Sequence, residues 1–142
     1  MRLHIGDIVN KVDYGELFPK SVLAFSTLAF IGIGISFIAF PESLLEVVGI
    51  HAPAGSPLTD IRAIYGGIDL GVGLFLLYCL VRSEVRLGLI ASALILFSLA
   101  AGRSVGLVLD GEQDAITFYL LAVEVLGGAL SAIAVTRAAK NR

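Results

Sequence analysis

Five polar or ionisable side chains lie within otherwise apolar stretches of the sequence, where they could do chemistry. They are Arg62, Tyr65, Asp69, Arg103 and Glu124. A charged side chain inside membrane hydrocarbon costs on the order of 3 kcal/mol, so such residues face a bundle interior and pair with one another or bind a polar group. We therefore expect these five residues to form one site.

The residue types favour ligand binding at this site. Arg62 and Arg103 would hold a polar head group, Asp69 and Glu124 would orient the two arginines, and Tyr65 would cap the site. Alternatively, the two acids and two bases would form a neutral ionic network that only fixes helix packing. As a further alternative, the two acids and Tyr65 would supply the acid and base of an intramembrane enzyme of the isomerase type. Nothing in the spacing demands an enzyme, and we assign no catalytic residue.

Asp69, Arg103 and Glu124 are expected to lie at similar depths in the membrane. Asp69 lies seven residues into its apolar stretch, Arg103 six residues before the end of its own, and Glu124 nine residues into its own. At a rise of 1.5 Å per residue, these positions are roughly 10, 9 and 13 Å below one membrane face, since successive helices alternate in direction. We expect Arg103 to pair with both Asp69 and Glu124.

The elements that must position these residues follow from composition and length. The chain has 142 residues, of which 57% are hydrophobic and only 15% charged, with a mean hydropathy of +0.93. A bilayer core of about 30 Å needs roughly 20 apolar residues, and the backbone inside it must be helical to satisfy its hydrogen bonds. The sequence predicts one all-α domain over 1–142, an antiparallel bundle of four transmembrane helices at about 21–40, 62–81, 87–109 and 115–136.

The segment before the first span predicts a short amphipathic helix over 4–14. Ile5, Ile8, Val9 and Val12 recur at helical spacing there, and polar residues occupy the other side. Such a helix would lie in the membrane interface.

The basic residues predict the orientation of the bundle. Eight of the ten Lys and Arg residues lie in the N-terminal segment, the loop between the second and third spans and the C-terminal tail. Because Lys and Arg in short loops favour the cytoplasmic side, we expect both termini to be cytoplasmic.

Composition disfavours nucleic acid as a partner, and it disfavours metals and cofactors bound through side chains. The net charge of −2 comes without a cluster of basic residues, which disfavours nucleic acid. Cys79 is the single cysteine, and His4 and His51 lie far apart outside the apolar runs. We therefore expect no metal site and no cofactor bound through side chains.

Glycines of the GxxxG spacing predict close helix packing. Gly67 and Gly71 form one such pair, Gly102 and Gly106 another, and Gly128 shares a helix face with Glu124. Small residues let helix backbones approach, either within the bundle or between two copies. The expected partners are membrane lipid and either a second copy of the chain or a larger membrane complex.

Three features together resemble a known family. These are "RAIYGGIDLGVGLFLL", "GRSVGLVLDG" and the late Glu124. Over residues 20–136 the pattern resembles a family of small four-helix bacterial membrane proteins described as a domain of unknown function. A looser likeness to DoxX-type proteins rests on helix count and on Gly-rich charged helices. The resemblance implies a four-helix fold in a bacterial cytoplasmic membrane and no particular activity.

Overall fold

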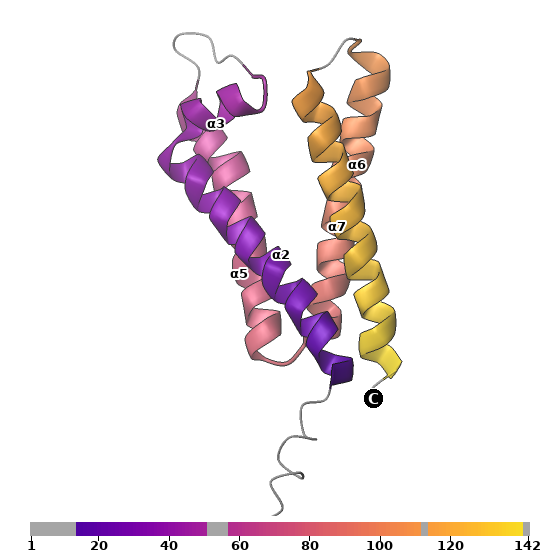
Figure 1. Ribbon diagram of the computed structural model, residues 1–142. Coiled ribbons are helices and arrows are strands. Elements are labelled where there is room, and N and C mark those ends of the chain that lie inside the picture. The colour runs from indigo at the N-terminus through magenta and orange to yellow at the C-terminus, as the bar shows by residue number, and fades with distance from the viewer. Residues whose placement is uncertain (1–13, 51–56, 112–113, 141–142) are drawn as a thin grey trace, which may run out of the picture.

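The computed structural model describes residues 14–50, 57–111 and 114–140. Over these ranges the protein is all-α, as predicted (Figure 1). The interfacial helix expected over 4–14 lies outside the described residues except for Tyr14, which begins the first helix.

Four long helical segments cross the length of the bundle. They are α2 (Tyr14–Ala39), a continuous segment made of α4 (Leu58–Ile61), η1 (Arg62–Gly67) and α5 (Ile68–Val81), then α6 (Val85–Leu109) and α7 (Ala115–Lys140). Each contains at least 24 residues apolar enough to span a bilayer. The chain is therefore a multi-pass membrane protein built on a four-helix bundle.

The helix starts differ from the expected spans more than the helix ends do. Helix α2 begins seven residues before the predicted start at 21, running through Pro19, which removes only one backbone bond so close to a helix start. A short helix α3 (Pro41–Val47) follows α2 directly, with Pro41 in its first turn. Polar helix ends extend past the apolar core, which hydropathy alone does not reveal.

Segment η1 is a π-helix of six residues, Arg62–Gly67. A π turn carries an additional residue relative to an α turn and is frequent at functional sites. It contains both Arg62 and Tyr65 of the predicted site. The 100° per residue of an α-helix therefore does not give the relative directions of side chains on the two sides of this turn.

The helices pack as two pairs. Helix α2 lies along η1 and α5, and α6 lies along α7. The pairs meet at the end of the bundle where α2 begins and α7 ends, and they diverge toward the other end (Figure 1). The hydrophobic core lies where the pairs meet and consists of Leu23, Phe30, Leu76, Cys79, Val85, Leu89 and Ala134.

Glycines bring α2 into backbone contact with its partner. A methyl group added at Gly73 would lie 2.8 Å from the backbone nitrogen of Ile31, and one at Gly66 would lie 3.2 Å from the carbonyl oxygen of Gly34. Between α6 and α7 the contact is made through side chains, including a buried hydrogen bond of 3.2 Å between the Ser92 and Ser131 hydroxyls.

Four of the five glycines predicted to pack helices contact no other helix that the structure describes. A methyl group at Gly71 or Gly102 would meet no atom within 4 Å, at Gly67 only the Arg62 carbonyl of the same segment, and at Gly106 only the Asp110 carboxylate at the end of its own helix. Of these five glycines only Gly128 packs against another helix, since a methyl group added there would lie 2.9 Å from the Phe97 ring on α6. Helix rotation turns the GxxxG faces outward, and their use between two copies stays a prediction.

Candidate functional site

Arg103 on α6 and Glu124 on α7 form an ion pair, as predicted. The Arg103 Nε donates to both carboxylate oxygens at 3.0 and 3.2 Å, and Nη2 donates to Oε1 at 2.7 Å. Glu124 is 7% exposed, so its charge is largely removed from the surface. A carboxylate so buried needs a bound cation, and the bidentate contact supplies one.

The pair leaves part of the Arg103 guanidinium without a partner. An arginine has five N–H donors, and Glu124 receives only the Nε proton and one Nη2 proton. The Arg103 side chain is 29% exposed, and among the described residues no buried side-chain nitrogen or oxygen lacks a partner. The remaining donors therefore lie at an accessible surface where another molecule can reach them.

Tyr65 brings a phenol near this guanidinium from the other helix pair. Its ring stacks on Phe37 of α2, with centroids 5.4 Å apart and an interplanar angle of 26°. The phenol lies near enough to Arg103 to contribute to its electrostatic environment, and no hydrogen bond joins the two side chains. Tyr65 is 44% exposed, so its hydroxyl also stays accessible.

Arg62 makes a backbone contact that the sequence did not predict. Its Nε donates to the carbonyl oxygen of Ile38 at 3.0 Å, near the end of α2. The last carbonyls of a helix lack backbone partners and carry partial negative charge, so a guanidinium is favourable there. Arg62 thus ties η1 to the end of α2, and within the described ranges it makes no ion pair with Asp69.

The expected pairing of Asp69 with Arg103 is wrong for the part of the chain the structure describes. Asp69 is half-buried in the first turn of α5 and makes neither an ion pair nor a hydrogen bond there. Its helix belongs to the α2 pair, whereas Arg103 and Glu124 belong to the α6 pair, and the two pairs diverge at this level. A carboxylate without a hydrogen-bonding or ionic partner is costly in an apolar segment, so binding of a polar partner to Asp69 would be favourable.

The five predicted residues therefore divide into three arrangements. Arg103 and Glu124 are joined, Tyr65 lies near Arg103, and Arg62 and Asp69 make no ion pair or hydrogen bond with either of the joined residues. Two residues that sequence reasoning missed help to hold the site, namely the Phe37 ring and the Ile38 carbonyl. Neither carries a sequence signal, because a phenylalanine and a backbone carbonyl are ordinary features of an apolar helix.

Comparison with known proteins gives one match. The model of a family described as a domain of unknown function (DUF4345) matches residues 19–135. No curated protein and no solved structure matches the chain.

Proposed function

The chain belongs to the DUF4345 family, a domain of unknown function, and we propose that it binds a lipid-like or small apolar molecule with a polar head, through Arg103, Tyr65 and Asp69. The observation that carries this proposal is the half-used guanidinium of Arg103. Glu124 holds one edge of it, which fixes its direction and leaves the other donors accessible.

The membrane setting makes these free donors significant. Inside hydrocarbon there is no bulk water to satisfy an accessible N–H group, so an unpaired guanidinium edge favours a polar partner. An acceptor oxygen on the ligand, such as a carbonyl or carboxylate, would bind Arg103. Tyr65 would donate or accept a second hydrogen bond, and Asp69 would accept one from a ligand hydroxyl.

The surroundings suit an apolar tail. Large hydrophobic side chains next to these residues in the sequence are exposed, including Ile64, Ile68 and Val105. A ligand could thus reach the polar groups from the lipid while its tail stays in an apolar environment.

Localisation is part of the proposal. Within the described residues, the end where the helix pairs meet carries four bases and two acids, namely Lys20, Arg82, Arg86, Arg137, Glu16 and Glu84. The described part of the other end carries one base, Arg62, and five acids, namely Glu42, Glu46, Asp60, Asp110 and Asp114. By the preference of Lys and Arg for the cytoplasmic side, both termini would be cytoplasmic. The membrane would be the cytoplasmic membrane of a bacterium, as the family resemblance implied.

The test uses substitutions that leave the Arg103–Glu124 pair intact. Tyr65→Phe removes only the hydroxyl and keeps the ring stacked on Phe37, and Asp69→Asn removes only the charge. Tyr78→Phe is the matched control, because Tyr78 is exposed on the same helical segment far from Arg103. Each variant is purified from membranes, and its bound apolar molecules are measured by mass spectrometry.

The expected result is a species bound to the wild type and to Tyr78→Phe, reduced roughly 3- to 10-fold in the other two, since one hydrogen bond is worth about 1 kcal/mol. Equal amounts in all four proteins would refute the site. No bound species in any of them would also count against it.

A structural role in a larger membrane complex is the second candidate. It is supported by Gly71 and Gly102, which present exposed helix backbone, since a methyl group added at either would meet no atom within 4 Å. Under this alternative Tyr65→Phe and Asp69→Asn would bind the same lipids as the wild type, while Gly71→Leu would shift the size of the complex in mild detergent.

A further inference from the structure

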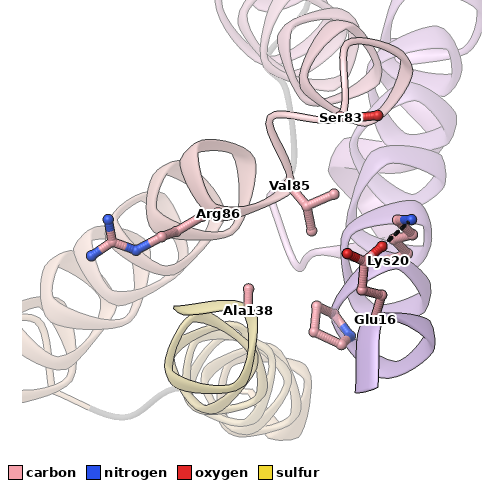
Figure 2. A pocket seen from close by; sticks show the side chains of 7 residues that line it. Glu16, Lys20, Ser83, Val85, Arg86 and Ala138 are labelled. Atoms are coloured by element: carbon pink, nitrogen blue, oxygen red, sulfur yellow. Dashed lines mark hydrogen bonds and ion pairs between the residues drawn. The ribbon is translucent and has the colours of Figure 1, made fainter. Parts of the chain in front are cut away.

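A cavity of about 270 Å³ lies at the end of the bundle away from Arg103. It opens between the start of α2, the turn that joins α5 to α6 and the end of α7 (Figure 2). Its polar lining consists of Glu16, Lys20, Ser83 and Arg86. This cavity has no part in the proposed ligand site and is argued from separate residues.

The cavity has a positive balance of charge. Lys20 Nζ donates to Glu16 Oε2 at 2.6 Å, which uses one of its three donors. Arg86 has no ion-pair or hydrogen-bond partner within the described ranges, and it lies across from the Lys20–Glu16 pair with its guanidinium turned outward (Figure 2). Among the lining residues, two cations and one acid leave a net charge of one positive unit, and the exposed Arg86 side chain can turn over the opening.

The first turn of α6 adds further donors. No side chain caps this helix, and its backbone bonding begins with the Gly88 amide donating to the Glu84 carbonyl. The preceding amides in the turn carry partial positive charge that favours an anion. Ser83, in the left-handed region at φ 60°, precedes this turn with its hydroxyl.

The cavity lies at the level of lipid head groups. Helix α6 has 25 residues, about 37 Å at 1.5 Å per residue, which exceeds a hydrocarbon core of about 30 Å. Because the exposed charges of Arg82, Glu84 and Arg86 lie at its start, this end of α6 lies in the head-group layer. The rest of the lining, Pro19, Val85 and Ala138, is apolar.

We propose that this cavity binds the phosphate of an anionic glycerophospholipid in the leaflet on the side of the termini. Basic pockets between transmembrane helices at the cytoplasmic face suit such head groups, and each nearby Lys or Arg contributes about 1 kcal/mol. Lys20, Arg86 and the α6 amides bind the phosphate oxygens, and the Ser83 hydroxyl donates to one of them. The apolar lining contacts the glycerol and the first methylenes.

The experiment is native mass spectrometry on the full chain in detergent, titrated with dioleoyl phosphatidylglycerol or dioleoyl phosphatidylcholine. The variants are Arg86→Gln and Lys20→Gln, both at exposed positions. The matched control is Arg82→Gln, which removes the same charge from the same turn at a residue outside the cavity lining. Glycerol 3-phosphate is added as a competitor in a further arm.

The wild type and Arg82→Gln should carry at least fivefold more phosphatidylglycerol than phosphatidylcholine. Arg86→Gln and Lys20→Gln should each lower that excess about fivefold, which corresponds to about 1 kcal/mol per cation, with unchanged thermal midpoints in lipid-free detergent. Equal binding of the two lipids would overturn the proposal, as would equal losses in Arg82→Gln and Arg86→Gln. Displacement of the lipid by equimolar glycerol 3-phosphate would reassign the cavity to soluble phosphate esters.

Discussion

Arg103 and Glu124, 21 residues apart in the sequence, are locked together across α6 and α7 by hydrogen bonds of 2.7 to 3.2 Å. The carboxylate is buried, whereas the guanidinium stays partly accessible. Glu124 therefore fixes the direction of the guanidinium, whose remaining donors stay accessible. This asymmetry also separates the structural contribution of the pair from its proposed use in binding.

Replacing Glu124 alone should destabilise the bundle. Glu124→Gln leaves the Arg103 charge without its counterion, at a cost of about 1–3 kcal/mol, because interhelical polar contacts in membranes are worth less than buried pairs in soluble proteins. The double variant Arg103→Leu with Glu124→Leu removes both charges and should recover most of that loss. Thermal unfolding in detergent measures both effects, and a double variant as unstable as the single one would contradict this account.

Two glycines on α5 form a matched pair. A methyl group at Gly73 would lie 2.6 Å from Ile31 Cγ1 and 2.8 Å from its backbone nitrogen, so Gly73→Ala forces α2 and α5 apart and should cost about 1–3 kcal/mol. Gly71→Ala meets open space and should be neutral or stabilising by up to about 1 kcal/mol, because alanine favours helix. Equal thermal midpoints for the two variants would show that the close contact is not where we place it.

Arg62 should act locally on the end of α2. Arg62→Gln removes the hydrogen bond to the Ile38 carbonyl, which we expect to cost about 0.5–1 kcal/mol, and to speed hydrogen exchange in a peptide covering 36–48. A peptide from the middle of α7 should not change. Arg82→Gln, at another exposed arginine, provides the comparison, and an equal effect from it would argue against a specific cap.

Backbone conformation predicts that two substitutions in the connecting turns change the stability in opposite directions. Ser83 has φ 60°, so Ser83→Gly should raise stability by about 1 kcal/mol by relieving left-handed strain. Gly111 has φ 81° and open space around it, so Gly111→Ala should lower stability by a similar amount for the same reason. Changes of the same sign in denaturation measurements would contradict the assigned conformations.

The orientation of the bundle in the membrane can be tested with variants that each gain one exposed cysteine. Cys79 is fully buried and should not react, so Ser83→Cys and Thr59→Cys report on the two ends of the bundle. In intact cells a membrane-impermeant maleimide should label Thr59→Cys alone, and after lysis it should label both. Labelling of Ser83→Cys in intact cells would place the termini outside the cytoplasm.

Much of the fold was predictable because it depends on local composition. Each span is recognised from its own apolar length, and the connecting segments from their charges, prolines and glycines. The pairing of Arg103 with Glu124 was also predictable, because a charge deep in an apolar helix needs a partner and few were available. These inferences need no knowledge of how the helices are rotated.

Helix rotation and pair divergence were decided only by the tertiary structure. Gly66 and Gly73 contact α2, whereas Gly71, of the more conspicuous GxxxG motif, faces outward. Asp69 lies on α5, which packs against α2, and it makes no ion pair with Arg103 on α6, while Arg62 binds a backbone carbonyl that no sequence pattern marks. Sequence alone determined which segments enter the membrane and which charges need partners, because both follow from the free energy of transfer of each residue. The choice of partner depended on how the segments turn and pack, which is a property of all four helices together.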